Sequence, residues 1–119
     1  LVLPGGTFNA DALRMVPLAR QFARAMQSSG KTIGVICHGP WLLVEADLLR
    51  DRTATSWPSI RTDLRNAGAV VIDEAAVTDG NIVTSRNPDD VEAFTDALID
   101  LIETMPESKS AARTKEFSA

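Results

Sequence analysis

Apolar and polar positions along the chain follow the periods of buried strands and of amphipathic helices. Residues 33–36 are apolar on both faces of an extended chain, which predicts a central strand of a parallel sheet covered on both sides. Within residues 17–29, apolar side chains recur at i, i+4, i+7 and i+8 from Leu18 onward, and residues 91–105 carry a second apolar stripe. Both stripes predict amphipathic helices that pack on the sheet.

The second half of the chain predicts further strands and a hairpin. Residues 69–73 read as a strand, and the Asp79-Gly80 pair within residues 77–84 is typical of a tight turn between antiparallel strands. A short helix over residues 60–66 follows an extended segment at residues 53–57. This alternation of strands and helices predicts an α/β fold, a three-layer sandwich with a mostly parallel sheet and antiparallel edges.

The predicted strand at residues 33–36 ends at Cys37, which is the only cysteine of the chain. Gly39 permits unusual backbone angles and close approach, and Pro40 suits the first turn of a helix over residues 41–46. The chain is therefore expected to turn sharply from strand to helix with a thiol at the corner. The positive end of a helix favours the nucleophilic thiolate, and backbone N–H groups at such a corner can hold an oxyanion.

Two interpretations of Cys37 stay open, because a free cysteine often behaves as a small buried hydrophobe. The sequence 37–40 favours the reactive interpretation, since a core cysteine needs neither a turn glycine, nor a helix-opening proline, nor an adjacent imidazole. His38 is the only histidine, so it must take the thiol proton or donate to a developing oxyanion itself, unless it is a turn residue facing solvent. Trp41 and Trp57 are interpreted as packing residues at element ends.

Composition narrows the classes of partner. A length of 119 residues fits one domain over residues 1–106, and residues 107–119 are polar enough to predict a disordered tail. The net charge of −4 argues against nucleic acid and anionic membranes as partners, and no apolar run approaches transmembrane length. A single cysteine, with no secretory segment visible, favours the cytoplasm. One Cys and one His cannot build a zinc set and no nucleotide fingerprint is present, so neither metal nor cofactor is expected.

Five stretches of the chain carry recognisable motifs: residues 3–6, 36–40, 55–60, 63–69 and 83–90. Together, in this order, they resemble the PfpI-like intracellular protease branch of the ThiJ/PfpI superfamily. The resemblance implies a flavodoxin-like fold of the class I glutamine amidotransferase-like type. It also implies that the family's first strand, helix and second strand, with a glutamate that hydrogen-bonds the nucleophile, are missing before Leu1. Relatives are described as peptidases, as glyoxalases that act on methylglyoxal without a cofactor, or as deglycases, and some as stress-response proteins.

The resemblance also implies roles for particular residues. Cys37 corresponds to the nucleophile, and His38 to its imidazole partner. Asp11 corresponds to an acidic residue that reaches the histidine of a neighbouring subunit, although it is shorter than the glutamate of many relatives and has a local alternative as a helix cap. Gly6 and the corner residue Gly39 are expected at the oxyanion site. A homo-oligomer would therefore complete the site.

Two functions are consistent with these expectations. The first is a cysteine-dependent hydrolase or stress-response enzyme of the PfpI type, a peptidase, glyoxalase or deglycase that acts on small carbonyl compounds or peptides through Cys37. The second is a non-catalytic, truncated relative that keeps the thiol corner and serves as a redox-sensing or oligomeric assembly module.

Overall fold

The computed structural model describes residues 1–104. The prediction of a disordered tail at residues 107–119 lies outside this range. Short 3₁₀ helices are written η. In chain order the elements are β1 (Val2–Leu3), α1 (Thr7–Arg14), α2 (Pro17–Ser28), β2 (Ile33–Ile36), α3 (Pro40–Glu45), β3 (Thr53–Ala54), η1 (Pro58–Ile60), α4 (Arg61–Asn66), β4 (Val70–Val71), β5 (Ala76–Asp79), β6 (Ile82–Ser85), η2 (Pro88–Asp90) and α5 (Val91–Thr104).

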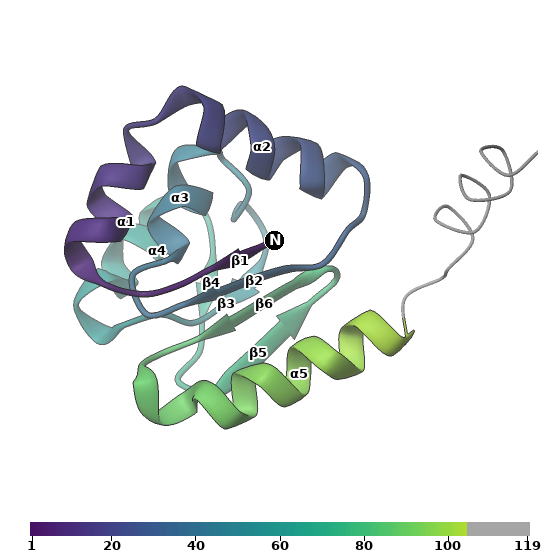
Figure 1. Ribbon diagram of the computed structural model, residues 1–119. Coiled ribbons are helices and arrows are strands. Elements are labelled where there is room, and N and C mark those ends of the chain that lie inside the picture. The colour runs from purple at the N-terminus through teal and green to yellow at the C-terminus, as the bar shows by residue number, and fades with distance from the viewer. Residues whose placement is uncertain (105–119) are drawn as a thin grey trace, which may run out of the picture.

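A four-stranded sheet forms the centre of the molecule, in the order β1-β2-β6-β5. β1, β2 and β6 run parallel, and β5 pairs antiparallel with β6 at the edge. The helices α1, α2 and α3 lie on one side of this sheet and α5 lies on the other (Figure 1). The predicted α/β fold with a mostly parallel sheet is therefore confirmed. β3 and β4 form a separate parallel pair.

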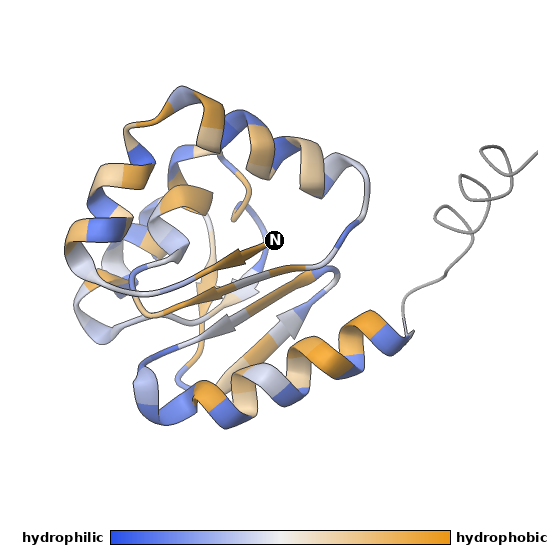
Figure 2. Cartoon of the chain, in the orientation of Figure 1, coloured by the Kyte–Doolittle hydropathy of each residue, from blue (hydrophilic) through white to orange (hydrophobic). Residues whose placement is uncertain are grey.

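The strand β2 is buried along its whole length, as its sequence predicts. On the α5 side, Phe94 is buried with Ile36 and Val83, and the middle of the predicted apolar stripe packs against them. Hydrophobic and hydrophilic positions alternate along α5 in Figure 2, while β1 and β2 are largely hydrophobic. The two ends of the stripe, Val91 and Ile102, remain 51% and 60% exposed.

The helix α2 packs on a different face from the one its apolar period predicts. Leu18 and Phe22 are 72% and 53% exposed, whereas Ala23 is completely buried. Ala19 and Met26 pack with it against the larger core cluster. Small alanine side chains allow the helix backbone to approach the sheet closely, so shape complementarity outweighs the burial of two larger side chains.

No helix within residues 1–104 is both long enough and apolar enough to cross a membrane.

Gly39 is required for space and not for an unusual backbone angle. Its φ of −49° and ψ of −37° are ordinary helical values. A Cβ built on it would lie 2.9 Å from the carbonyl oxygen of Leu3 and 3.0 Å from that of Ile36. Both are backbone atoms of sheet strands and cannot move independently. The glycine therefore lets the start of α3 approach the ends of β1 and β2.

We expect Gly39→Ala to lower the free energy of unfolding by about 1–3 kcal/mol, the usual cost of forcing a methyl group into filled space. Urea denaturation followed by circular dichroism measures this loss. Gly30→Ala is the matched control, because nothing lies within 4 Å of its Cβ position and only its φ of 69° is strained. That control should lose roughly 1 kcal/mol. A Gly39→Ala protein as stable as the parent would contradict the close approach.

Candidate active site

Cys37 adopts a left-handed backbone conformation at the junction between β2 and α3. Its φ is 64°, a value that costs a residue with a side chain about 1–2 kcal/mol. Two hydrogen bonds hold it there: its N–H donates to the carbonyl of Ser85 at 3.0 Å, and its carbonyl accepts from the N–H of Trp57 at 2.9 Å. The predicted sharp corner is present, and its unusual backbone angle belongs to the thiol residue itself.

The imidazole of His38 lies directly beside this thiol. Sγ of Cys37 and Nδ1 of His38 are 3.1 Å apart, and Nε2 of His38 lies 3.4 Å from Oγ1 of Thr7. His38 is only 7% exposed. Burial lowers the pKa of His38 below its ordinary 6.5, because desolvation disfavours the charged ring. With the ring proton on Nε2, facing Thr7, a neutral imidazole can accept the thiol proton at Nδ1.

Two tryptophan rings cover the imidazole. Trp57 stacks on His38 with ring centroids 5.7 Å apart and an interplanar angle of 25°, and Trp41 meets it edge-on at 5.2 Å. Trp41 is held in turn by a hydrogen bond from its Nε1 to Asp63 and by the guanidinium of Arg14, 5.1 Å from the ring centroid. Both tryptophans are packing residues, as predicted, and both pack against the imidazole of His38. Their positions in the sequence did not reveal this partner.

The glycines around the thiol have different structural roles. A Cβ on Gly5 would lie 2.8 Å from Cβ of Cys37 and 3.3 Å from its Sγ, so the backbone at Gly5 presses against the thiol residue. The N–H of Gly39 already donates to the carbonyl of Ile36 at 2.9 Å. Among the hydrogen bonds of residues 1–104, none uses the N–H of Gly6 or of His38. The N–H of Gly5 has no partner there either, so the amides of Gly5, Gly6 and His38 are all available as donors around the thiol residue.

The structure does not bring Asp11 to the imidazole of the same chain. Asp11 is exposed on α1, and its side chain forms no hydrogen bond or ion pair within the described part of the chain. Thr7, the first residue of α1, lies beside His38 instead. The sequence offered no signal for Thr7, because the helix begins earlier than the predicted cap around Asp11. A role for Asp11 toward a second chain remains an expectation.

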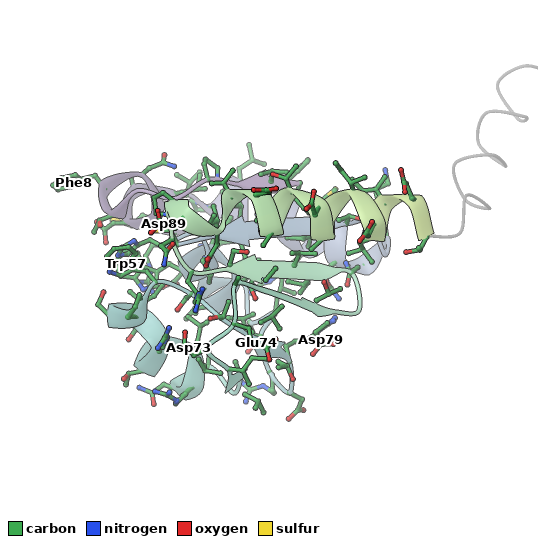
Figure 3. The ribbon with its side chains drawn as sticks, turned by 90° about the horizontal axis from the view of Figure 1, so that it is seen from below. Phe8, Trp57, Asp73, Glu74, Asp79 and Asp89 are labelled. Carbon is green, nitrogen blue, oxygen red and sulfur yellow. The ribbon has the colours of Figure 1, made fainter. Side chains whose placement is uncertain are left out.

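The Cys37–His38 corner lies at the end of the molecule where β1, β2 and β6 finish. Figure 3 shows the exposed side chains of Phe8 and Trp57 at this end. The thiol residue itself is partly exposed. Within residues 1–104 no group of three His, Cys, Asp or Glu side chains could hold a metal ion. A cavity of about 380 Å³ lies elsewhere, and neither Cys37 nor His38 lines it. Its lining residues are Arg14, Val44, Asp47, Arg50, Asp63, Asn66 and Ala67.

Known proteins are similar to this chain in sequence. YraA of Bacillus subtilis, provisionally named a cysteine protease, is 45% identical over 102 residues, which cover 86% of this chain and 60% of YraA. Deglycase PfpI of Pyrococcus furiosus is 42% identical over 102 residues, 86% of this chain and 61% of that protein. The chain thus spans about three fifths of the length of these curated relatives.

A crystal structure gives the same result at the level of the fold. It is a two-domain protein of Anabaena variabilis with DJ-1/ThiJ/PfpI-like and ferritin-like domains, and it superposes with a TM-score of 0.83 at 42% identity. The match covers 86% of this chain and 29% of that one. The DJ-1/PfpI family model matches residues 1–101. The chain therefore belongs to the DJ-1/PfpI family.

Proposed function

We propose that this chain carries the reactive centre of a cysteine-dependent hydrolase or deglycase of the PfpI type, with Cys37 as the nucleophile. The observation that carries the proposal is the 3.1 Å contact between Sγ of Cys37 and Nδ1 of the buried His38, at a strained corner between strand and helix. The relatives named as a cysteine protease and as a deglycase support the same class of chemistry. Small carbonyl compounds or peptides are the proposed substrates.

The reaction begins with transfer of the thiol proton to Nδ1 of His38. The thiolate of Cys37 then attacks a carbonyl carbon, and the electron pair of the C=O bond moves to oxygen. The free N–H groups of His38 and Gly6 are the proposed donors to that oxyanion, while Gly39 contributes space instead of a hydrogen bond. The expected role of Gly39 at the oxyanion site is therefore to leave space for the main chain, and not to donate a hydrogen bond to the oxyanion.

The fate of the adduct depends on the carbonyl compound that is attacked. An aldehyde such as methylglyoxal gives a hemithioacetal, in which the proton on His38 passes to the oxyanion. A peptide gives a tetrahedral adduct that expels its amine with the proton from His38 and leaves a thioester, which water then hydrolyses. In either case a second copy of the chain, presenting Asp11 to His38, is the proposed means of orienting the imidazole.

Replacing the nucleophile tests the enzyme proposal directly. We expect Cys37→Ala to reduce consumption of methylglyoxal and cleavage of a fluorogenic peptide by at least about 100-fold for whichever is the substrate, because no other residue supplies a thiol. Thr95→Ala, an exposed substitution on α5, is the control and should keep the parent rates. Equal turnover in Cys37→Ala and the parent would refute Cys37 as the nucleophile, whereas a parent with no turnover would favour a redox-sensing or assembly module.

The pH dependence of turnover tests the role of His38. Because burial lowers the pKa of His38, the ring stays neutral down to below pH 6.5, and the acid limb of the kcat/KM profile should lie below that value. Trp57→Ala uncovers the ring and should move this limb upward, toward pH 6.5. Phe8→Ala removes another exposed aromatic side chain without a ring contact to His38 and should leave the limb in place. An unchanged limb in Trp57→Ala would contradict the burial argument.

A further inference from the structure

One peptide group connects the thiol corner to a buried carboxylate on the next element. The carbonyl of Ser85 accepts the hydrogen bond from the N–H of Cys37 at 3.0 Å. The N–H of the same peptide unit belongs to Arg86 and donates to Oδ2 of Asp90, also at 3.0 Å. A peptide unit is planar, so fixing its N–H also fixes the direction of its carbonyl.

Asp90 is itself firmly held. It is only 5% exposed, and its two carboxylate oxygens accept hydrogen bonds from Nε and Nη2 of Arg86 at 2.9 and 3.0 Å. The turn that carries it is closed by Asn87, whose side chain accepts from the N–H of Asp89 and whose carbonyl accepts from the N–H of Asp90. Arg86 lowers the pKa of Asp90, chiefly through these hydrogen bonds, so the carboxylate is ionised at neutral pH.

Because the backbone of Cys37 is strained, the position of its thiol depends on the peptide unit that Asp90 holds. A left-handed cysteine keeps its φ of 64° only while its neighbours hold it, and the Ser85 carbonyl provides one of its two backbone hydrogen bonds. We propose that Asp90 is a positioning residue for Cys37: its carboxylate fixes the Ser85–Arg86 peptide, and that peptide fixes the thiol beside His38. The inference rests on the proposed function only in taking Cys37 as the reacting group.

A different role for the same charges predicts a different outcome. Arg86 also donates from Nη1 to Asp73 at 3.0 Å, and Arg61 donates to the same carboxylate oxygen at 2.8 Å. These ion pairs connect α4 to the segment after β6. If the cluster served only to hold these elements together, loss of Asp73 and loss of Asp90 would affect the thiol alike. Only Asp90 contacts the peptide that reaches Cys37.

Alkylation of Cys37 by iodoacetamide at neutral pH tests the proposal without any enzyme substrate. We expect Asp90→Ala to slow alkylation by about tenfold, because the thiol loses its fixed contact with the imidazole that accepts its proton. Asp90→Asn keeps an oxygen acceptor for the Arg86 N–H and should show a smaller change in the same direction. Asp73→Asn should match the parent.

The direction of the change in alkylation rate separates positioning from simple electrostatics. Deleting a carboxylate near a thiol favours the thiolate and would speed alkylation. An unchanged or faster rate in Asp90→Ala, or an equal loss of rate in Asp73→Asn, would therefore overturn the proposal. If Asp90→Ala does not fold, Arg86→Lys serves instead. This variant keeps the main-chain N–H of residue 86 but loses the paired guanidinium hydrogen bonds to the Asp90 carboxylate. This variant should slow alkylation partially, and parent-like alkylation would overturn the inference.

Failure of the proposed enzyme function gives a distinct result. A parent protein without turnover of any carbonyl compound, but with alkylation that still depends on Asp90, would remove the enzyme proposal and keep the positioning role.

Discussion

The structure depends on one local constraint, the left-handed backbone of Cys37 between a fully buried strand and a helix. Nothing in a cysteine favours that conformation, so the surrounding main chain must impose it. The parallel ladder between β2 and β6 continues one hydrogen bond beyond the strands to hold its N–H, and the N–H of Trp57 holds its carbonyl. The consequence is a partly exposed thiol residue that packs at the margin of the Phe94 cluster and lies against an imidazole.

Close approach of main-chain segments makes this corner possible. Gly5 leaves room for the side chain of Cys37, and Gly39 leaves room for the carbonyls at the ends of β1 and β2. Two tryptophans then remove His38 from water, which keeps its ring neutral at pH 7 and suited to accepting a proton. The same packing that stabilises the carboxyl end of the sheet therefore sets the protonation state of the site.

Part of this arrangement could be predicted, because local rules govern it. The apolar run of β2 and the hairpin at Asp79-Gly80 depend on neighbouring residues only. The Gly39-Pro40 pair marks where the corner falls, although distant main chain holds Cys37 in its conformation. The face of α2 could not be predicted from its period, because close packing of Ala23 against the sheet outweighed the burial of Leu18 and Phe22. The contact of Thr7 with His38 could not be predicted either, because it depends on where α1 begins after the turn at Gly5-Gly6.

The sequence by itself determined the strand, the turn and the adjacent Cys37 and His38, since short-range backbone preferences and residue chemistry are written into a few consecutive positions. Only the tertiary structure decided which groups surround that pair: the Trp57 ring, the Ser85 carbonyl and, beyond it, Asp90. These partners come from segments far apart along the chain. Their meeting is fixed by strand register and packing density, which no local pattern encodes.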